Sequence, residues 1–246
     1  CIRETTSNEI AANALASGEV SLAAGTAWLW ARPEFEQSVD VLFVDEAGQM
    51  SLADVLAISQ AAQSIVLLGD PQQLEQPIQG AHRPGVDASA LEHVLGGNRT
   101  MPPDCGLFLS ETWRLAPPIC AFTSELFYED RLRCHPGLDR QKLAGPSSFS
   151  GAGLWYVPVE HSANQNTSVE EADTVERIVA DLLQPGVEWM DSKGFLNPLD
   201  LQDILIVAPY NAQVRCLRSA MPDARIGTVD KFQGQEAPIV IYSMAT

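Results

Sequence analysis

The stretch Val41–Gln49, Val-Leu-Phe-Val-Asp-Glu-Ala-Gly-Gln, decides the fold expected of this chain. Four consecutive apolar residues followed by two acids are typical of a strand buried on both faces of a parallel sheet. Ligands of such sheets bind beyond the carboxyl ends of the strands, which is where Asp45 and Glu46 emerge. Two carboxylates are costly there without a cation or a reaction to serve. They predict a nucleotide-hydrolysis site, with Asp45 on Mg²⁺ and Glu46 on the attacking water. A strand that ends in solvated acids is the alternative.

A second strand with a polar exit follows the first. Residues 51–62 have the spacing of a helix, and residues 64–68 are a second apolar run, which ends in Gly69-Asp70-Pro71-Gln72-Gln73-Leu74. Strand, helix and strand in this order predict a βαβ unit, so the two polar loops share one edge of a parallel sheet. Gln73 is therefore expected to face Asp45 and Glu46, where an amide can bind a phosphate oxygen or water. A surface-loop glutamine is the alternative.

The composition of the chain narrows the kinds of protein that it can be. The chain has 246 residues, 46% of them hydrophobic, and a net charge of −17. This acidity argues against a broad phosphate-binding patch, but a narrow nucleic-acid channel remains possible. No apolar run has the length of a membrane span, so no membrane association is expected. Five scattered cysteines without a C-x-x-C pair favour reduced thiols and a cytoplasmic location. Both ends of the chain look cut, and a fragment is expected.

The second half repeats the α/β plan of the first. Three apolar runs are predicted to be parallel strands, at residues 203–208, 225–229 and 239–244. Ser168 and Glu171 have the spacing of a capping box for a helix that reaches about Leu183. The remaining local predictions are a helix over 7–17, a strand-like run over 27–30, helices near 88–95 and over 119–126, a loop over 136–153 and a strand over 154–159.

Five segments, in a fixed order, resemble the signature motifs of superfamily 1 helicases in their 5′-to-3′ branch (SF1B, with AAA_11/AAA_12-like domains). The matching segments are Asp45–Gly48 (Walker B), Gly69–Leu74 (motif III), Trp113–Pro117 (normally Arg-Met-His-Pro), Pro209–Gln213 (Pro-Tyr-x-x-Gln) and Gly227–Glu236 (motif V). The sequence around these motifs is most similar to that of bacterial helicases fused to a RecB-like nuclease. No nuclease motif is present in this sequence.

The resemblance implies a fold and a set of roles. The fold is α/β, with two RecA-like P-loop NTPase domains that have parallel sheets, the first (1–106) truncated at its N-terminus and the second (107–246) at its C-terminus. ATP is then expected between the domains. The implied roles are Mg²⁺ binding for Asp45, water activation for Glu46, γ-phosphate sensing for Gln73, an arginine finger for Arg114, backbone approach to the γ-phosphate for Gly234 and ribose binding for Glu236. The residues implied to contact nucleic acid are Thr26, Pro209, Tyr210, Thr228 and Lys231.

Three departures from the family pattern qualify this transfer. No G-x-x-x-x-G-K-[ST] phosphate loop occurs in the sequence, and the final arginine motif is missing. Truncation is expected to explain both. Ala116 stands where the family usually has His, which removes a packing or hydrogen-bonding group beside Arg114.

The function expected is the ATP-dependent motor core of a nucleic-acid helicase or translocase, with ATP and Mg²⁺ as cofactors. Its partner is expected to be single-stranded nucleic acid, DNA in preference to RNA, with a RecB-like nuclease domain in the same full-length chain. The isolated fragment is expected to be inactive as an ATP hydrolase for lack of the phosphate loop. A non-catalytic nucleic-acid-binding module with the helicase fold is one alternative. A metal nuclease using Asp45 and Glu46 is another, and it requires further carboxylates converging on one metal cluster.

Overall fold

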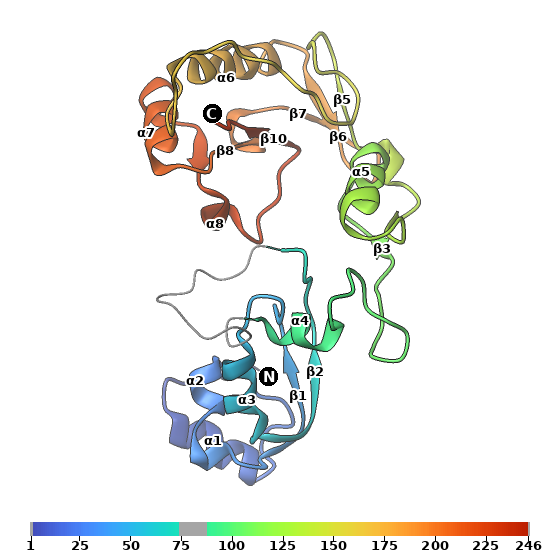
Figure 1. Ribbon diagram of the computed structural model, residues 1–246, viewed down its shortest axis with the longest axis vertical. Helices are drawn as coiled ribbons and strands as arrows, with labels where there is room; N and C mark the ends of the chain where they lie inside the picture. Colours follow the sequence, from blue (N-terminus) through green and yellow to red (C-terminus); the bar gives the residue numbers. More distant parts are fainter. Residues whose placement is uncertain (1, 74–87, 246) are drawn as a thin grey trace. The chain divides into compact units, whose positions relative to one another are not determined.

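A computed structural model describes residues 2–73 and 88–245. The chain divides into two compact units. The first unit comprises Cys1–Phe108 together with Phe127–Glu129, and the second comprises Leu109–Leu126 and Asp130–Thr246. Both units mix helices with parallel strands, so the α/β fold class is confirmed (Figure 1). The assignment of the units to two RecA-like domains, divided after residue 106, stays a prediction.

The first unit is built around a βαβ element. Strands β1 (Val39–Val44) and β2 (Ala62–Leu67) pair in parallel, with Val44 opposite Leu67. Helix α3 (Leu52–Ser59) connects them. Ser51 is its N-cap, and the Ser51 hydroxyl accepts a hydrogen bond from the Asp54 N–H. A parallel pair needs such a crossover because its strands run in the same direction. The βαβ prediction is confirmed.

The core of the first unit lies on one face of its sheet. Leu42 and Val44 are buried, whereas Val41 and Phe43 are 42% and 61% exposed. The expectation that this strand is buried on both faces is therefore wrong within the described residues. Figure 1 shows why: helices α1 (Asn8–Ala16), α2 (Ala27–Trp30) and α3 lie on the same side of β1 and β2.

Residues 27–30 were expected to be strand-like, and the structure corrects this to a helix, α2. Short apolar runs do not distinguish a strand from a buried helix turn. Here Trp30 is 6% exposed and its ring meets the Phe35 ring edge-on at 5.4 Å, while Trp28 points outward and is 86% exposed. The remaining elements of the first unit are η1 (Pro33–Phe35) and α4 (Ala90–Leu95), the latter with a complete Ser89–Glu92 capping box.

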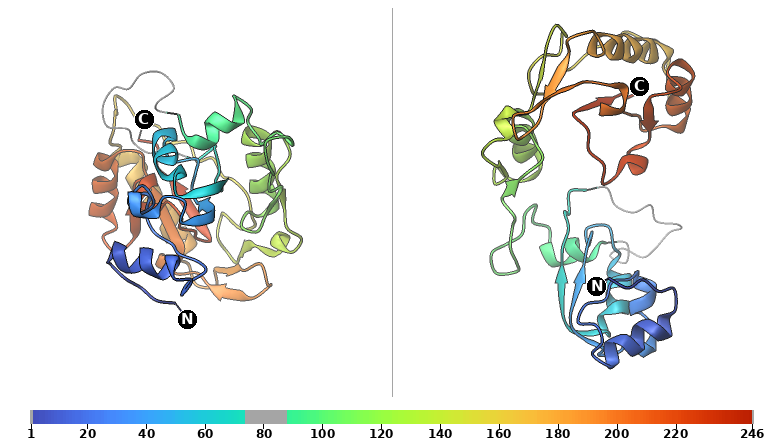
Figure 2. Two further views of the ribbon diagram at one scale, coloured as in Figure 1. Left: turned by 90° about the horizontal axis from the view of Figure 1, so that it is seen from below. Right: turned by 180° about the vertical axis from the view of Figure 1, so that it is seen from behind.

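The second unit contains a three-stranded parallel sheet in the order β10–β8–β9. All four residues of the central strand β8 are buried, as predicted. Helices α6 and α7 pack against one face of this sheet (Figure 2), and Phe232 of α8 packs on the other. The bounds are β8 (Ile204–Val207), β9 (Arg225–Gly227), β10 (Ile239–Tyr242), α6 (Val169–Leu182), α7 (Asn211–Ala220) and α8 (Val229–Phe232).

Two smaller sheets complete the second unit, and they correct two local predictions. Residues 136–153, expected to be a loop, contain η2 and β5, while residues 154–159, expected to be a strand, pair with no strand in the described part of the chain. An apolar segment forms a strand only where a second strand lies beside it, and the local sequence does not show whether one does. The elements are β3 (Glu111–Thr112) parallel to β4 (Arg133–Cys134), antiparallel β5 (Lys142–Ala144), β6 (Glu188–Met190) and β7 (Leu196–Pro198), helix α5 (Pro117–Phe127), η2 (Leu138–Arg140) and η3 (Leu201–Asp203).

The predicted capping box at the start of α6 is only half formed. The Ser168 hydroxyl accepts from the Glu171 N–H at 3.1 Å, but the Ser168 N–H donates to Gln213 Oε1 at 2.7 Å. The Glu171 carboxylate is thereby left to accept from the Ser243 hydroxyl and the Ala245 N–H, at 2.7 and 3.0 Å. A buried polar network thus joins α6, α7 and the end of β10.

No helix among the described residues is long and apolar enough to cross a membrane. Cys105, Cys120, Cys134 and Cys216 are all free thiols, in agreement with the prediction from their spacing. Cys1 lies outside the described residues.

Candidate functional site

The loops that follow β1 and β2 pack against each other through their backbones. The Ala47 N–H donates to the Leu68 carbonyl at 2.8 Å. A Cβ at Gly48 would lie 2.4 Å from the Asp70 carbonyl oxygen, and one at Gly69 would lie 2.8 Å from the Ala47 nitrogen. Only glycine permits this approach. The predicted Walker B and motif III loops are therefore one packed structure, of which Leu74 lies outside the described residues.

Replacing Gly48 by Ala tests this packing. The added methyl group meets a backbone carbonyl, which cannot rotate away, so we expect a loss of about 1–3 kcal/mol in the free energy of unfolding, as for other overpacked sites. The measurement is equilibrium urea unfolding. Gly106→Ala is the matched control, because the described atoms nearest to its Cβ belong to the flexible Met101 side chain, the first at 3.1 Å. Equal effects of the two substitutions would contradict the close approach.

The two acids leave β1 in different backbone conformations. Asp45 Oδ1 accepts a hydrogen bond from the Glu46 N–H at 3.0 Å. Glu46 has a φ of 54°, in the left-handed region that few non-glycine residues adopt. Such strain persists where the surroundings over-determine it, and it concentrates at functional sites. Both side chains are exposed, as a role in binding a ligand requires.

Gln49 connects the acid of one loop to the amide of the other. Its Nε2 atom donates to Gln73 Oε1 at 3.2 Å and to Glu46 Oε2 at 3.5 Å. Gln73 and Glu46 thus share Gln49 as a hydrogen-bonding partner, and the direct role predicted for Gln73 stays a prediction. Sequence reasoning missed Gln49 as a site residue, although its place three residues after Glu46 in the same exit loop was the available signal.

The Asp45 carboxylate at the end of β1 is suited to binding Mg²⁺ as a single protein ligand. Asp45 Oδ2 takes no hydrogen bond from the described residues and is open to solvent. The described ranges contain no group of three or more His, Cys, Asp or Glu side chains that could enclose a metal. A single carboxylate suits Mg²⁺, which keeps waters and is completed by substrate phosphates. The carboxylate cluster required by the metal-nuclease alternative does not occur in these ranges.

A tyrosine donates a hydrogen bond to the loop that follows β2. Asp70 Oδ1 accepts from the Gln72 N–H at 3.0 Å, and Asp70 Oδ2 accepts from the Tyr128 hydroxyl at 2.5 Å. Burial raises the pKa of Tyr128 well above its usual value, and the hydrogen bond to Asp70 raises it further. The hydroxyl therefore stays a donor at neutral pH and fixes the loop that carries Gln73. Nothing in the sequence around Tyr128 pointed to this contact.

In the second unit, Arg114 and Glu236 meet. Arg114 follows β3, and its Nε atom donates to Glu236 Oε2 at 2.7 Å. Their side chains are 63% and 68% exposed, so the pair contributes little to stability and both groups remain accessible to a ligand. Gly234, in the same loop as Glu236, has a φ of 74°, and a Cβ added there would meet no heavy atom of the described residues within 4 Å. Three predicted nucleotide-binding residues thus lie on neighbouring loops.

Alanine occupies position 116, and the His135 imidazole packs on the residue before Arg114. Ala116 is buried, and its carbonyl accepts from the Ile119 and Cys120 N–H groups at the start of α5. The Trp113 ring stacks on the His135 ring with centroids 3.4 Å apart, and His135 Nδ1 lies 2.9 Å from Glu111 Oε1. The ring packed on Trp113, the residue before Arg114, therefore comes from another segment of the chain, which sequence spacing did not reveal.

The residues predicted to contact nucleic acid are distributed over both units. Thr26 lies in the first unit, at the N-cap of α2, where its hydroxyl makes no capping bond. In the second unit, Lys231 Nζ donates to the Ile226 carbonyl at 3.1 Å, so this ammonium is partly engaged. Pro209 and Tyr210 are exposed between β8 and α7, and Thr228 is half-buried at the N-cap of α8.

The AAA domain family matches residues 86–246. Among known proteins, the DNA replication ATP-dependent helicase/nuclease JHS1 of Arabidopsis thaliana is 26% identical over 83% of this chain and 16% of its own length. Putative helicase mov-10-B.1 of Danio rerio is 26% identical over 82% of this chain and 23% of its own length. DNA polymerase alpha-associated DNA helicase A of Schizosaccharomyces pombe is 24% identical over 85% and 32%. The chain spans less than a third of each of these relatives.

Proposed function

The chain belongs to the AAA domain family, and on that premise we propose that it is the ATPase core of a nucleic-acid helicase. ATP is its substrate, with Mg²⁺ as cofactor, and hydrolysis moves the protein along a single strand of nucleic acid. Three relatives named as helicases, each similar over more than four fifths of this chain, support the proposal at the level of the family.

One observation carries the proposal: the Glu46–Gln49–Gln73 arrangement on two loops that pack backbone to backbone. Glu46 is proposed to accept the proton of the attacking water, because a carboxylate is a suitable general base. Gln73 is proposed to contact the terminal phosphate. Through Gln49, a displacement of the Gln73 amide reaches the Glu46 carboxylate. Asp45 is proposed to hold Mg²⁺, which supplies charge neutralisation of the phosphates.

The second unit is proposed to supply the transition-state contacts. Arg114 donates to the phosphate that is transferred, and Glu236 accepts from the ribose. Since these two side chains bond each other at 2.7 Å, nucleotide binding has to exchange this exposed ion pair for contacts with the ligand. The exchange costs little, because exposed ion pairs are worth at most about 1 kcal/mol.

The partner is proposed to be single-stranded DNA in preference to RNA, gripped by Thr26, Pro209, Tyr210, Thr228 and Lys231. Few and largely uncharged contacts of this kind are compatible with a net charge of −17. A cytoplasmic location and a RecB-like nuclease domain elsewhere in the full-length protein complete the proposal.

Strand separation by the full-length protein tests it. We expect ATP- and Mg²⁺-dependent unwinding of a DNA duplex with a 5′ single-stranded tail, and no unwinding of the same duplex with blunt ends. Binding of the tail without any ATP-dependent unwinding or turnover would favour the alternative, a non-catalytic nucleic-acid-binding module.

A further inference from the structure

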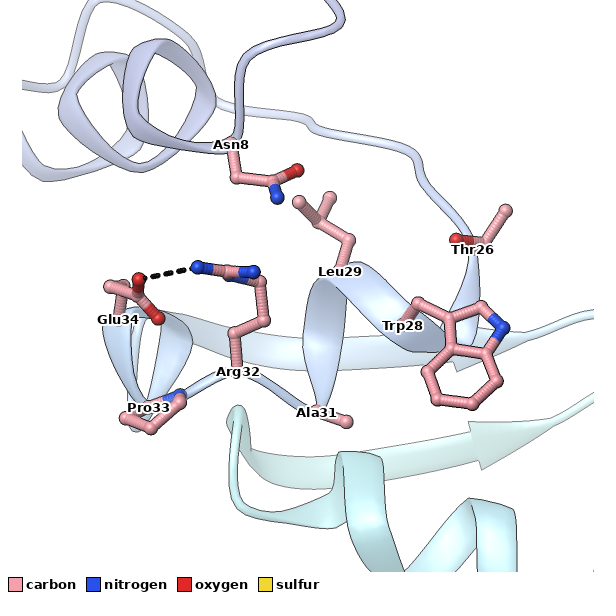
Figure 3. A pocket seen from close by; sticks show the side chains of 8 residues that line it. All are labelled: Asn8, Thr26, Trp28, Leu29, Ala31, Arg32, Pro33 and Glu34. Atoms are coloured by element: carbon pink, nitrogen blue, oxygen red, sulfur yellow. Dashed lines mark hydrogen bonds and ion pairs between the residues drawn. The ribbon is translucent and has the colours of Figure 1, made fainter.

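A pocket opens on the surface of the first unit beside Thr26. Its volume is about 760 Å³. Figure 3 shows Thr26 and Trp28 on one side, Arg32, Pro33 and Glu34 on the other, and Leu29 with Asn8 between them. The pocket combines an indole ring with a hydroxyl, an amide and a guanidinium. This set can hold a planar group that also carries hydrogen-bonding atoms.

The Trp28 ring is displayed on a rigid element. Two residues further on, Trp30 is buried against Phe35 and anchors α2 in the core. The end of the helix is tied down by Gln60, whose Nε2 donates to the Ala31 carbonyl at 2.9 Å. Trp28 itself is 86% exposed. Since the helix is fixed and the ring is open to solvent, a ligand can stack on the indole without reordering the backbone that carries it.

The pocket carries no net charge. Arg32 donates to Glu34 at 2.8 Å, and this hydrogen bond is the main reason why the pKa of Glu34 lies below its usual value. Glu34 therefore stays ionised at neutral pH and offsets the guanidinium. A neutral planar group fits these surroundings better than a phosphate, because the paired Arg32 and Glu34 charges cancel and leave no net positive charge to attract an anion.

We propose that this pocket is a nucleobase subsite, in which one base of a single strand stacks on the Trp28 indole. Thr26, next but one in the chain, then faces the sugar-phosphate of the same nucleotide. Stacking on an aromatic face is tolerant of sequence, so the subsite grips the strand without reading the base. The inference rests on the proposed function and adds a residue that the helicase motifs do not include.

Affinity for short oligonucleotides tests the subsite in the full-length protein. The probes are fluorescently labelled dT12 and rU12, and the readout is fluorescence anisotropy. We expect Trp28→Ala to weaken binding about 5- to 150-fold, the range for loss of one stacked base, and Trp28→Phe to retain most of the affinity. Trp155→Ala is the matched control, since Trp155 is also exposed, at 47%, but lies in the second unit. It is expected to bind like the wild type. A larger loss for rU12 than for dT12, or the reverse, identifies the strand that the subsite takes.

Quenching of the protein's own fluorescence is a second readout, which does not depend on the alanine variant folding. Stacking quenches an indole, so we expect dT12 or rU12 to quench the wild type more than Trp28→Phe. Unchanged affinity in Trp28→Ala, or equal quenching in the wild type and Trp28→Phe, would overturn the subsite. Neither result would affect the proposed function, provided that the wild type binds an oligonucleotide. A wild type that binds neither probe would remove both.

Discussion

Substituting Glu46 by Gln should reduce ATP turnover by about 10²- to 10⁴-fold, the usual contribution of a general base, while leaving ATP binding nearly intact. Glutamine has almost the shape of glutamate and can keep a hydrogen bond to Gln49, which lies 3.5 Å away in the native chain. It cannot accept the proton of the attacking water. The predicted defect is therefore chemical and not structural, and it should appear in kcat with little change in nucleotide affinity.

The measurement is phosphate release by the full-length protein under saturating ATP and single-stranded DNA, together with direct binding of a fluorescent ATP analogue. Glu36→Gln is the matched control, because Glu36 is an exposed glutamate of the same unit outside the two loops. If Glu46→Gln and Glu36→Gln turned over ATP equally fast, Glu46 would have no part in the chemistry. The alternative, a strand that ends in two solvated acids, would then hold.

Substituting Arg114 by Ala should also lower turnover by at least ~100-fold, the scale of one preorganised transition-state donor. Arginine fingers reach about 10³–10⁵ in nucleotide hydrolysis. Arg114→Lys is expected to recover little of the loss, because an ammonium lacks the planar fork of the guanidinium. The ion pair with Glu236 is exposed, so its removal should change the free energy of unfolding by no more than about 1 kcal/mol.

Steady-state turnover and a urea unfolding curve on the same preparation separate these effects. Arg140→Ala removes an exposed arginine elsewhere in the second unit and serves as the control. Turnover by Arg114→Ala at the wild-type rate would place Arg114 outside the site. A large fall in stability would instead make it a structural residue.

The parts of the fold that sequence predicted are those fixed by local pattern. Apolar runs with polar exits located β1, β2 and β8, and the spacing between the first two predicted their parallel pairing. The packing of the two loops against each other followed from the same argument, because the carboxyl ends of parallel strands lie at one edge of a sheet. Residues 27–30 failed because four apolar residues suit a helix turn as well as a strand, and only the burial of Trp30 against Phe35 decides between them.

What sequence could not supply are contacts between segments distant in the chain. The Tyr128 hydroxyl donates to Asp70, 58 positions earlier in the sequence. His135, which follows α5 in the sequence, stacks on Trp113, which precedes it. Glu171 had the right spacing for a capping box, yet Gln213 takes the Ser168 N–H in its place. A sequence motif indicates which hydrogen bonds are possible. Residues distant in the sequence can offer other partners, so the tertiary structure decides which bonds form. The roles of Asp45, Glu46, Gln73, Arg114, Gly234 and Glu236 in binding nucleotide stay predictions.

We propose that this chain is the motor core of an ATP-driven helicase. The most direct test is the rate of phosphate release by the full-length protein, with Mg²⁺ and ATP, in the presence and absence of single-stranded DNA. We expect turnover that single-stranded DNA strongly stimulates and that Glu46→Gln lowers by about 10²- to 10⁴-fold. No turnover with or without the strand, in a protein that still binds it, would contradict the claim.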